Sequence, residues 1–198
     1  MNKPKKLLYS LKQFSQEMNT YIALLRGINV SGQKIIKMDE LRESLKQLDF
    51  AKTQTYIQSG NIIFSCKKTD HLILETKISK LILENWDFEV PVIIRELEEL
   101  IKIKNGNPFL KDEGIDTSKL HVTFLSNTPK KESINGLSNF KNPSEQFKII
   151  EKEMYFYFPN GVGKSKLTNK LFERKLSVIC TSRNWRTVNK LIEIGENF

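Results

Sequence analysis

The sequence predicts an α+β protein made of two ferredoxin-like subdomains, each a split βαβ unit, which we expect to share a sheet. Its 198 residues suffice for one large or two small domains, and its content of 39% hydrophobic and 28% charged residues is typical of a globular protein. Apolar runs of strand length alternate with amphipathic helical segments in the order β-α-β-β-α-β. The same order, with an abbreviated last strand, begins again near residue 120.

The first unit opens with a near-continuous apolar run at residues 21–27, which is typical of a buried central strand. A helix over residues 39–48 carries leucines at helical spacing. Strands at 53–58 and 61–66 are separated by Ser59-Gly60, which predicts a tight hairpin. A helix over 70–85 follows. Pro91 then favours an edge position for the strand at 90–95, before a helix at 96–104.

The second unit follows a strong break, N-G-N-P at residues 105–108. We expect a strand at 120–126, a helix at 130–137, a hairpin from 147–151 and 153–158, a helix at 164–175, a short strand at 177–181 and a final helix at 183–194. The predicted domain plan is therefore a flexible or helical extension (1–17), a first subdomain (18–104), a connection (105–119) and a second subdomain with a C-terminal helix (120–198).

Positive charge is concentrated at the two ends of the chain. The formal net charge is +9, and residues 160–198 carry eight Lys or Arg against three Glu, whereas residues 18–159 are nearly balanced. A basic segment indicates an anionic partner, although a solvated surface explains it equally well. No apolar run reaches the roughly 18–20 residues of a membrane span, so no membrane partner is expected. Two distant cysteines without a CxxC pattern favour a reducing, cytoplasmic location.

The strongest candidate site is the glycine-containing loop before the helix expected to begin near Lys164. Gly161 and Gly163 precede Lys164, Ser165 and Lys166. Backbone N–H groups at a helix start lack intrahelical partners and favour anions, whereas lysines there oppose the helix dipole. The loop therefore predicts a phosphate or carboxylate site. A tight turn with surface lysines is the simpler alternative.

The expected final helix repeats this basic start. Arg183 and Arg186 fall in its first turn beside Asn184, with Thr181 or Ser182 as the predicted N-cap. An anion at this helix start would suit the two arginines. Pairing with acidic residues of the other subdomain is the alternative.

A third group of candidate residues surrounds the end of the first strand. Arg26 and Asn29 follow that strand, and Ser59 and Asn61 flank the hairpin glycine. These residues either contribute to a ligand pocket or cap loops, and their spacing does not decide between the two.

Several other kinds of site are excluded or weakly supported. No catalytic triad, metalloprotease motif or Cys–His signature occurs, so no catalytic residue is assigned and neither a cofactor nor a metal is expected. A nucleotide-hydrolysing P-loop needs a glycine where Phe158 stands. A base-stacking sheet of the RNA-recognition type is a weaker alternative, carried by Tyr155 and Tyr157.

Four stretches, L-L-R-G-I-N, Y-I-Q-S-G-N, N-G-V-G-K-S-K-L-T-N and R-N-W, occur in this order. With them, the chain from about Met18 to its C-terminus resembles the bacterial domain-of-unknown-function family number 1697. The resemblance implies two ferredoxin-like subdomains sharing a sheet, and it supplies no activity, cofactor or catalytic residue. Lys164 stands where family members often carry Arg, which weakens bidentate anion binding. The family signature falls on Arg26, Gly27, Asn29, Ser59, Gly60, Asn61, Gly161, Gly163, Ser165, Lys166, Leu167, Thr168, Arg183, Asn184 and Trp185.

We therefore expect an anion-binding protein whose ligand bears phosphate, either a nucleic-acid backbone or a nucleotide-like molecule. Charge would come from Lys164, Lys166, Arg183 and Arg186, and donors from the backbone of residues 161–165. One alternative is an enzyme acting on a small phosphorylated or carboxylated substrate. Another is a structural or interaction module whose basic residues pair within the chain. The sequence does not give the oligomeric state.

Overall fold

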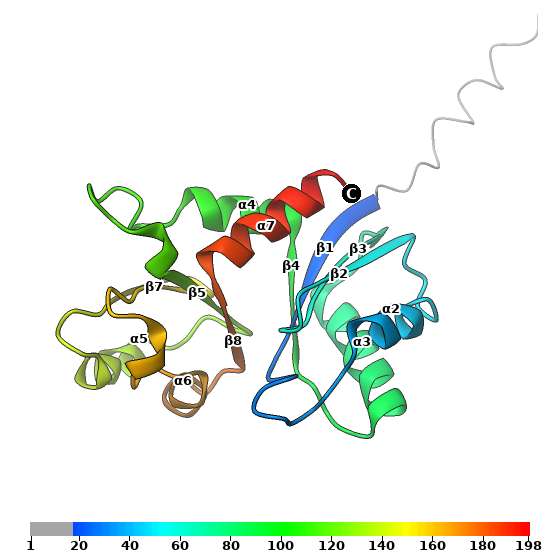
Figure 1. The fold of residues 1–198 in the computed structure, drawn as a ribbon, viewed down its shortest axis with the longest axis horizontal. Coiled ribbons are helices and arrows are strands. Elements are labelled where there is room, and N and C mark those ends of the chain that lie inside the picture. Colours follow the sequence, from blue (N-terminus) through cyan, green and yellow to red (C-terminus); the bar gives the residue numbers. More distant parts are fainter. Residues whose placement is uncertain (1–17) are drawn as a thin grey trace, which may run out of the picture.

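A computed structural model describes residues 18–198, which form two four-stranded antiparallel sheets (Figure 1). The predicted extension at residues 1–17 lies outside this range. The strand orders are β2-β3-β1-β4 and β6-β7-β5-β8, the order of a split βαβ unit in both cases. The predicted fold class, two ferredoxin-like subdomains, is confirmed.

The elements of the first subdomain are β1 (Met18–Leu25), α2 (Met38–Leu45), β2 (Lys52–Tyr56), β3 (Asn61–Lys67), α3 (His71–Trp86), β4 (Val92–Glu96) and α4 (Leu97–Asn105). Those of the second are η1 (Thr117–Lys119), β5 (Leu120–Leu125), α5 (Lys131–Ile134), η2 (Asn135–Phe140), β6 (Gln146–Ile150), β7 (Glu153–Tyr157), η3 (Val162–Lys164), α6 (Asn169–Leu176), β8 (Cys180–Asn184) and α7 (Trp185–Glu196). Pro91 precedes β4, and β4 is an edge strand as the sequence predicts.

The two sheets are separate, which differs from the expected shared sheet. Their edge strands β4 and β8 are capped by side chains rather than paired with each other. The N–H of Ile94 in β4 donates to Glu75, and the N–H of Cys180 in β8 donates to Glu173. A carboxylate on an edge N–H removes a donor that a neighbouring strand would need.

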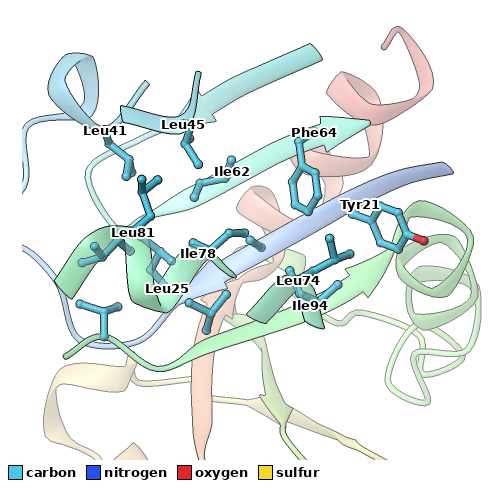
Figure 2. Packing of buried hydrophobic residues seen from close by; sticks show 14 of the residues in the cluster. Tyr21, Leu25, Leu41, Leu45, Ile62, Phe64, Leu74, Ile78, Leu81 and Ile94 are labelled. Atoms are coloured by element: carbon cyan, nitrogen blue, oxygen red, sulfur yellow. The ribbon is translucent and has the colours of Figure 1, made fainter. Parts of the chain in front are cut away.

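Helices cover the outer face of each sheet. In the first subdomain, α2 and α3 pack on β1, β3 and β4 around an apolar core that Figure 2 shows. Tyr21 and Phe64 stack in this core, with ring centroids 5.6 Å apart. In the second subdomain, α6 and η2 bury Phe156 and Phe172 in the same way. Among residues 18–198, no helix is long and apolar enough to cross a membrane.

The inner faces of the two sheets enclose a third apolar core. Ile22 and Leu24 of β1 meet Val122 and Phe124 of β5 there, together with apolar residues of α4 and α7. These two helices lie side by side between the sheets, across the top of Figure 1. Because each sheet covers the open face of the other, the two subdomains form one packed unit.

This packing contradicts the RNA-recognition alternative. Tyr155 of β7 is 3% exposed, and Tyr157 packs half-buried against the core between the sheets. Base stacking needs aromatic rings on an open sheet face. The opposite sheet, α4 and α7 occupy that space here.

The β2–β3 hairpin approaches the end of β1 so closely that only glycine fits at its last loop position. Gly60 has a φ of +75°, and a Cβ added to it would lie 2.6 Å from Ile28 Cδ1 and 2.7 Å from Leu25 Cβ. The loop spans four residues, from Ile57 to Gly60, because Ile57 also adopts a left-handed conformation, with a φ of 51°. The hairpin is therefore less tight than predicted.

We expect Gly60→Ala to lower the free energy of unfolding by about 2–3 kcal/mol, combining left-handed strain with overpacking. Gly114→Ala is the matched control, because Gly114 has a φ of +80° and nothing lies within 4 Å of the added Cβ. Its cost should be about 1 kcal/mol, from strain only. Urea denaturation measures both. Equal losses in the two variants would show that close packing at Gly60 contributes nothing.

Candidate functional site

Three of the predicted site residues, Arg183, Asn61 and Ser59, meet between the two sheets. Arg183 lies in β8 and is 6% exposed. Its Nε donates to Asn61 Oδ1 at 2.5 Å, and its Nη2 donates to the carbonyl oxygens of Leu25 (3.0 Å), Ser59 (3.0 Å) and Gly60 (3.1 Å). These acceptors belong to the end of β1 and the β2–β3 hairpin. Arg183 therefore ties the second subdomain to the first.

Every N–H group of this guanidinium has an acceptor within the protein. Nη1 donates to Thr181 Oγ1 and to the carbonyl oxygen of Ser182, both at 2.8 Å. Burial lowers the pKa of Arg183 to about 10, and the positive charge of Arg26 lowers it as well. The group stays protonated at pH 7, and none of its hydrogen-bond acceptors is a carboxylate. Its charge is held by neutral oxygens.

Arg95 makes the reverse connection, from the first subdomain to the second. It lies in β4 and is 4% exposed. Its Nε donates to Glu153 Oε1 at 3.0 Å, and its Nη2 donates to the carbonyl oxygens of Leu125 (2.9 Å) and Lys152 (3.5 Å). Its Nη1 donates to the carbonyl oxygen of Ile94 at 2.8 Å. The sequence did not predict a role for Arg95 or Glu153.

The two arginines occupy equivalent positions in the two subdomains. Arg95 lies opposite Ile22 in the β4–β1 ladder, and Arg183 lies opposite Val122 in the β8–β5 ladder. Arg95 donates to the carbonyl of Leu125, the last residue of β5, and to the side chain of Glu153, the first residue of β7. In the same way, Arg183 donates to the carbonyl of Leu25, the last residue of β1, and to the side chain of Asn61, the first residue of β3. We call these contacts the arginine latches: Arg95 with Glu153, Leu125 and Lys152, and Arg183 with Asn61, Leu25, Ser59 and Gly60.

Arg26 and Asn29, the other predicted residues of the first subdomain, are also engaged within the chain. Arg26 binds both carboxylate oxygens of Glu173 on α6, at 2.9 and 3.1 Å. Asn29 Nδ2 donates to the carbonyl oxygens of Ile36 and Gln58, and its Oδ1 accepts from the Ile36 N–H. Both side chains are thus engaged in hydrogen bonds within the chain.

The helix expected at Lys164 begins five residues later, at the start of α6. A single 3-10 turn, η3, stands in its place. Thr168 is the N-cap of α6, and its Oγ1 accepts from the Leu171 N–H at 3.3 Å. The predicted anion site at a helix start near Lys164 is therefore wrong in its geometry, because the lysine lies in a loop.

The glycine loop itself presents its lysines to solvent. Gly161 has a φ of +80°, and Gly163, Lys164 and Lys166 are exposed. Ser165 is half-buried and its Oγ accepts a backbone N–H two residues later, at 3.0 Å. The loop thus offers charge rather than a preformed cradle of N–H groups.

The last helix, α7, also begins later than expected. Asn184 is its N-cap and accepts the N–H three residues later at 2.8 Å, whereas the predicted caps Thr181 and Ser182 belong to β8. Arg183 is therefore a strand residue, which corrects its placement in the first helical turn. Arg186 does lie in that turn and is exposed.

Exposed basic side chains gather on the outer helices of the second subdomain. α5 packs on α6, and both lie at the lower left of Figure 1. Lys170 and Arg174 stand four residues apart on α6, a spacing that places them on one helix face and that the sequence could have revealed. We call this set of exposed residues at α5, on α6 and in the loop before α6 the basic face: Lys130, Lys131, Lys164, Lys166, Lys170, Arg174 and Lys175.

These side chains are free of acidic partners. Within residues 18–198, none of the seven forms an ion pair. The ammonium group of Lys175 lies over the ring of Phe140, 5.3 Å from its centroid. The basic face can therefore contact an anion without first breaking a salt bridge.

The family model described as "Protein of unknown function (DUF1697)" matches residues 18–155, more than half of the chain. The chain belongs to this family. The matched range includes Arg26, Ser59, Asn61 and Arg95, and it ends before the loop at 161–166 and before β8. Of the basic face, the matched range includes Lys130 and Lys131.

A solved structure shows the same fold. The conserved bacterial protein SP0830 from Streptococcus pneumoniae matches with a TM-score of 0.69 at 21% sequence identity, over 90% of this chain and 99% of that one. At this identity the likeness concerns the fold. No curated protein matches the chain.

Proposed function

We propose that the protein binds the phosphates of nucleic acid through the basic face. The observation that carries this proposal is the unequal charge of the two subdomains. Residues 18–119 hold fifteen basic and fifteen acidic residues, whereas residues 120–198 hold thirteen basic and seven acidic residues. Positive potential is therefore concentrated on the second subdomain, where it attracts a polyanion.

The placement of acidic side chains strengthens this potential. Glu173, the only acid of α6, turns toward Arg26 and the Cys180 N–H. Glu145 is 4% exposed, and both its carboxylate oxygens accept hydrogen bonds from Asn142. Glu173 is thus paired within the protein and Glu145 is buried, whereas Glu132 of α5 stays exposed.

The proposal keeps the loop lysines of the sequence prediction and leaves out residues with structural contacts. The omitted residues are Arg26, Asn29, Ser59, Asn61, Arg183 and Asn184. Arg186 is exposed on α7, outside the basic face. Basic residues spread along a loop and a helix fit the extended phosphate backbone of a nucleic acid better than they fit a single nucleotide. The enzyme alternative needs Arg26 and Asn29 free to bind a substrate, and both are engaged in hydrogen bonds within the chain.

A nucleic-acid role is compatible with the state of the cysteines. Cys66 and Cys180 are both buried free thiols. Burial raises the pKa of the Cys180 thiol to about 12, and Glu173 contributes to the rise. Such thiols are unreactive at neutral pH, and the proposal of a reducing, cytoplasmic location rests on the two distant cysteines of the sequence.

We expect Lys166→Glu with Lys170→Glu to weaken binding to a 20-base-pair DNA duplex by at least about tenfold in 50 mM salt, because two phosphate contacts become repulsive. Fluorescence anisotropy measures the dissociation constant. Lys170 is in the first turn of α6, where glutamate suits the helix dipole, so unfolding does not account for a loss of binding.

The matched control is Lys77→Glu with Lys111→Glu, which changes the net charge equally on exposed positions of residues 18–119. We expect the control to lose less than about threefold, through the long-range field. Equal losses in the two double variants, or no binding by the unmodified protein in 50 mM salt, would contradict the proposal.

A further inference from the structure

We infer that the basic face binds a nucleic-acid duplex through its backbone, without contacts to unstacked bases. This inference rests on the proposed function and specifies its ligand. Proteins that bind single strands without sequence preference combine a positive groove with aromatic rings on which bases stack. The aromatic side chains near the basic face therefore decide between a single strand and a duplex.

The aromatic residues of the second subdomain are turned inward. Phe156, Phe158 and Phe172 stack on one another beneath α6, with centroids 5.2 and 5.3 Å from that of Phe156. Phe147 packs against the same core, 5.9 Å from Phe156. Phe156, Phe158 and Phe172 are buried and present no free face to a base, and Phe147 is half-buried.

The remaining aromatic residue at the basic face is already covered by a cation. Phe140 is half-buried against the core of the second subdomain and lies under Lys175. Throughout residues 18–198, the exposed large apolar side chains are all aliphatic or methionine; Val162 is the one beside the loop lysines. The face that carries the charge therefore has phosphate-binding groups and no stacking platform.

The inner sheet surface, where a split βαβ unit can stack bases, is closed as well. Tyr155 is buried in the core between the sheets, and the two arginine latches join the strands that border this core. Opening it would require breaking the buried contacts of Arg95 and Arg183. Among residues 120–198, no aromatic side chain is exposed, so a single strand meets no open stacking platform on the second subdomain.

A duplex suits these groups better than a single strand does. Double-stranded DNA carries about one charge per 1.7 Å of axis. For each phosphate that the protein neutralises, the logarithm of the association constant falls with the logarithm of the salt concentration with a slope of about 0.9 for a duplex and about 0.7 for a single strand, because the duplex releases more condensed counterion. For about four phosphates at 0.1 M salt, this difference corresponds to roughly sixfold in affinity. Without stacking, a single strand has no compensating contact.

The test compares a 20-base-pair duplex, its two separate strands and oligo-dT of 20 nucleotides, by anisotropy at 0.1 M salt with the full chain. We expect the duplex to bind at least about fivefold more tightly than any single strand. A duplex of scrambled sequence should bind within about twofold, because one good base contact discriminates by more than that. DNA and RNA duplexes are measured in parallel, and tighter binding of either duplex than of its own strands supports the inference.

Single strands that bind as tightly as the duplexes would overturn the inference. If Lys166→Glu with Lys170→Glu then weakens both kinds of ligand, the proposed phosphate contact stands and only the preference for a duplex is wrong. If no nucleic acid binds in 50 mM salt, the proposed function itself fails. A strong preference for one duplex sequence would also contradict backbone binding.

Discussion

Arg183→Met is expected to lower the free energy of unfolding by about 3–4 kcal/mol. The substitution removes the donors from six acceptors, and it leaves Asn61 Oδ1 and the carbonyl oxygen of Ser59 without a donor. Thr181 Oγ1 still donates to the Leu25 carbonyl, and the Ser182 carbonyl is part-buried. The carbonyl oxygens of Leu25 and Gly60 each keep one other hydrogen bond. A buried acceptor that loses its partner costs about 1–3 kcal/mol, so the two orphaned oxygens account for most of the loss.

Urea denaturation of two further variants tests this explanation. Arg183→Lys keeps the charge but offers three N–H groups on a single nitrogen, so we expect it to be nearly as unstable as Arg183→Met. Arg186→Met is the control, since Arg186 is exposed, and it should change the unfolding free energy by less than about 0.5 kcal/mol. If Arg183→Lys retained full stability, charge rather than the geometry of the guanidinium would be what the junction requires.

Breaking the other latch is expected to cost more. Glu153→Leu should lower the free energy of unfolding by about 3–5 kcal/mol, because it leaves the Arg95 guanidinium buried without its carboxylate. Burial raises the pKa of the Glu153 carboxyl, and Arg95 opposes that rise through its charge and its hydrogen bond. The pair is thus stabilising mainly because the charge of each partner offsets the desolvation cost of burying the other.

A double-mutant cycle separates this effect from general packing. Arg95→Met with Glu153→Leu should be more stable than the sum of the single losses predicts, by about 2 kcal/mol or more, because no charge remains buried. The same cycle with Arg183→Met and Asn61→Leu should give a coupling below about 1.5 kcal/mol, since Asn61 is neutral. Additive losses at Arg95 and Glu153 would contradict a charge-coupled latch.

The order of the elements could be predicted from the sequence, because it follows from local periodicity. The apolar run at the end of β1 and the leucines of α2 are local sequence patterns, and the residues concerned are buried in the core of the first subdomain or in the core between the sheets. The sequence prediction misplaced the N-terminal ends of α6 and α7, where several polar residues compete to be the N-cap. Thr168 and Asn184 are both standard N-cap residues, yet the sequence prediction placed Lys164 and Arg183 in the first helical turns, although their charge opposes the helix dipole.

The role of Arg183 could not be predicted, because its acceptors are backbone carbonyls far away in the sequence. A carbonyl oxygen leaves no trace in residue identity, and it becomes an acceptor for Arg183 only when the hairpin folds onto β1. Arg95 could have been found by comparing the two units, since an arginine is the next-to-last residue of the fourth strand in both, as R-E-L-E-E and R-N-W-R-T. The glycine loop was identified for its lysines, which the structure leaves exposed.

The two sets of basic residues thus differ in what surrounds them. Arg26, Arg95 and Arg183 are held by contacts between the subdomains, whereas the lysines of the basic face lack ion-pair partners within residues 18–198. Substitutions in the first set should change stability. Substitutions in the second should change binding and leave stability within about 0.5 kcal/mol.

The salt dependence of duplex binding tests the proposed function most directly. The observed association constant of the unmodified protein should fall with salt between 50 and 200 mM, with a log–log slope of about −3 to −4 for roughly four phosphate contacts. Lys166→Glu with Lys170→Glu should make the slope shallower by about 2, and Lys77→Glu with Lys111→Glu should leave it nearly unchanged. A slope near zero, or one that the substitutions at Lys166 and Lys170 do not change, would contradict phosphate binding at the basic face.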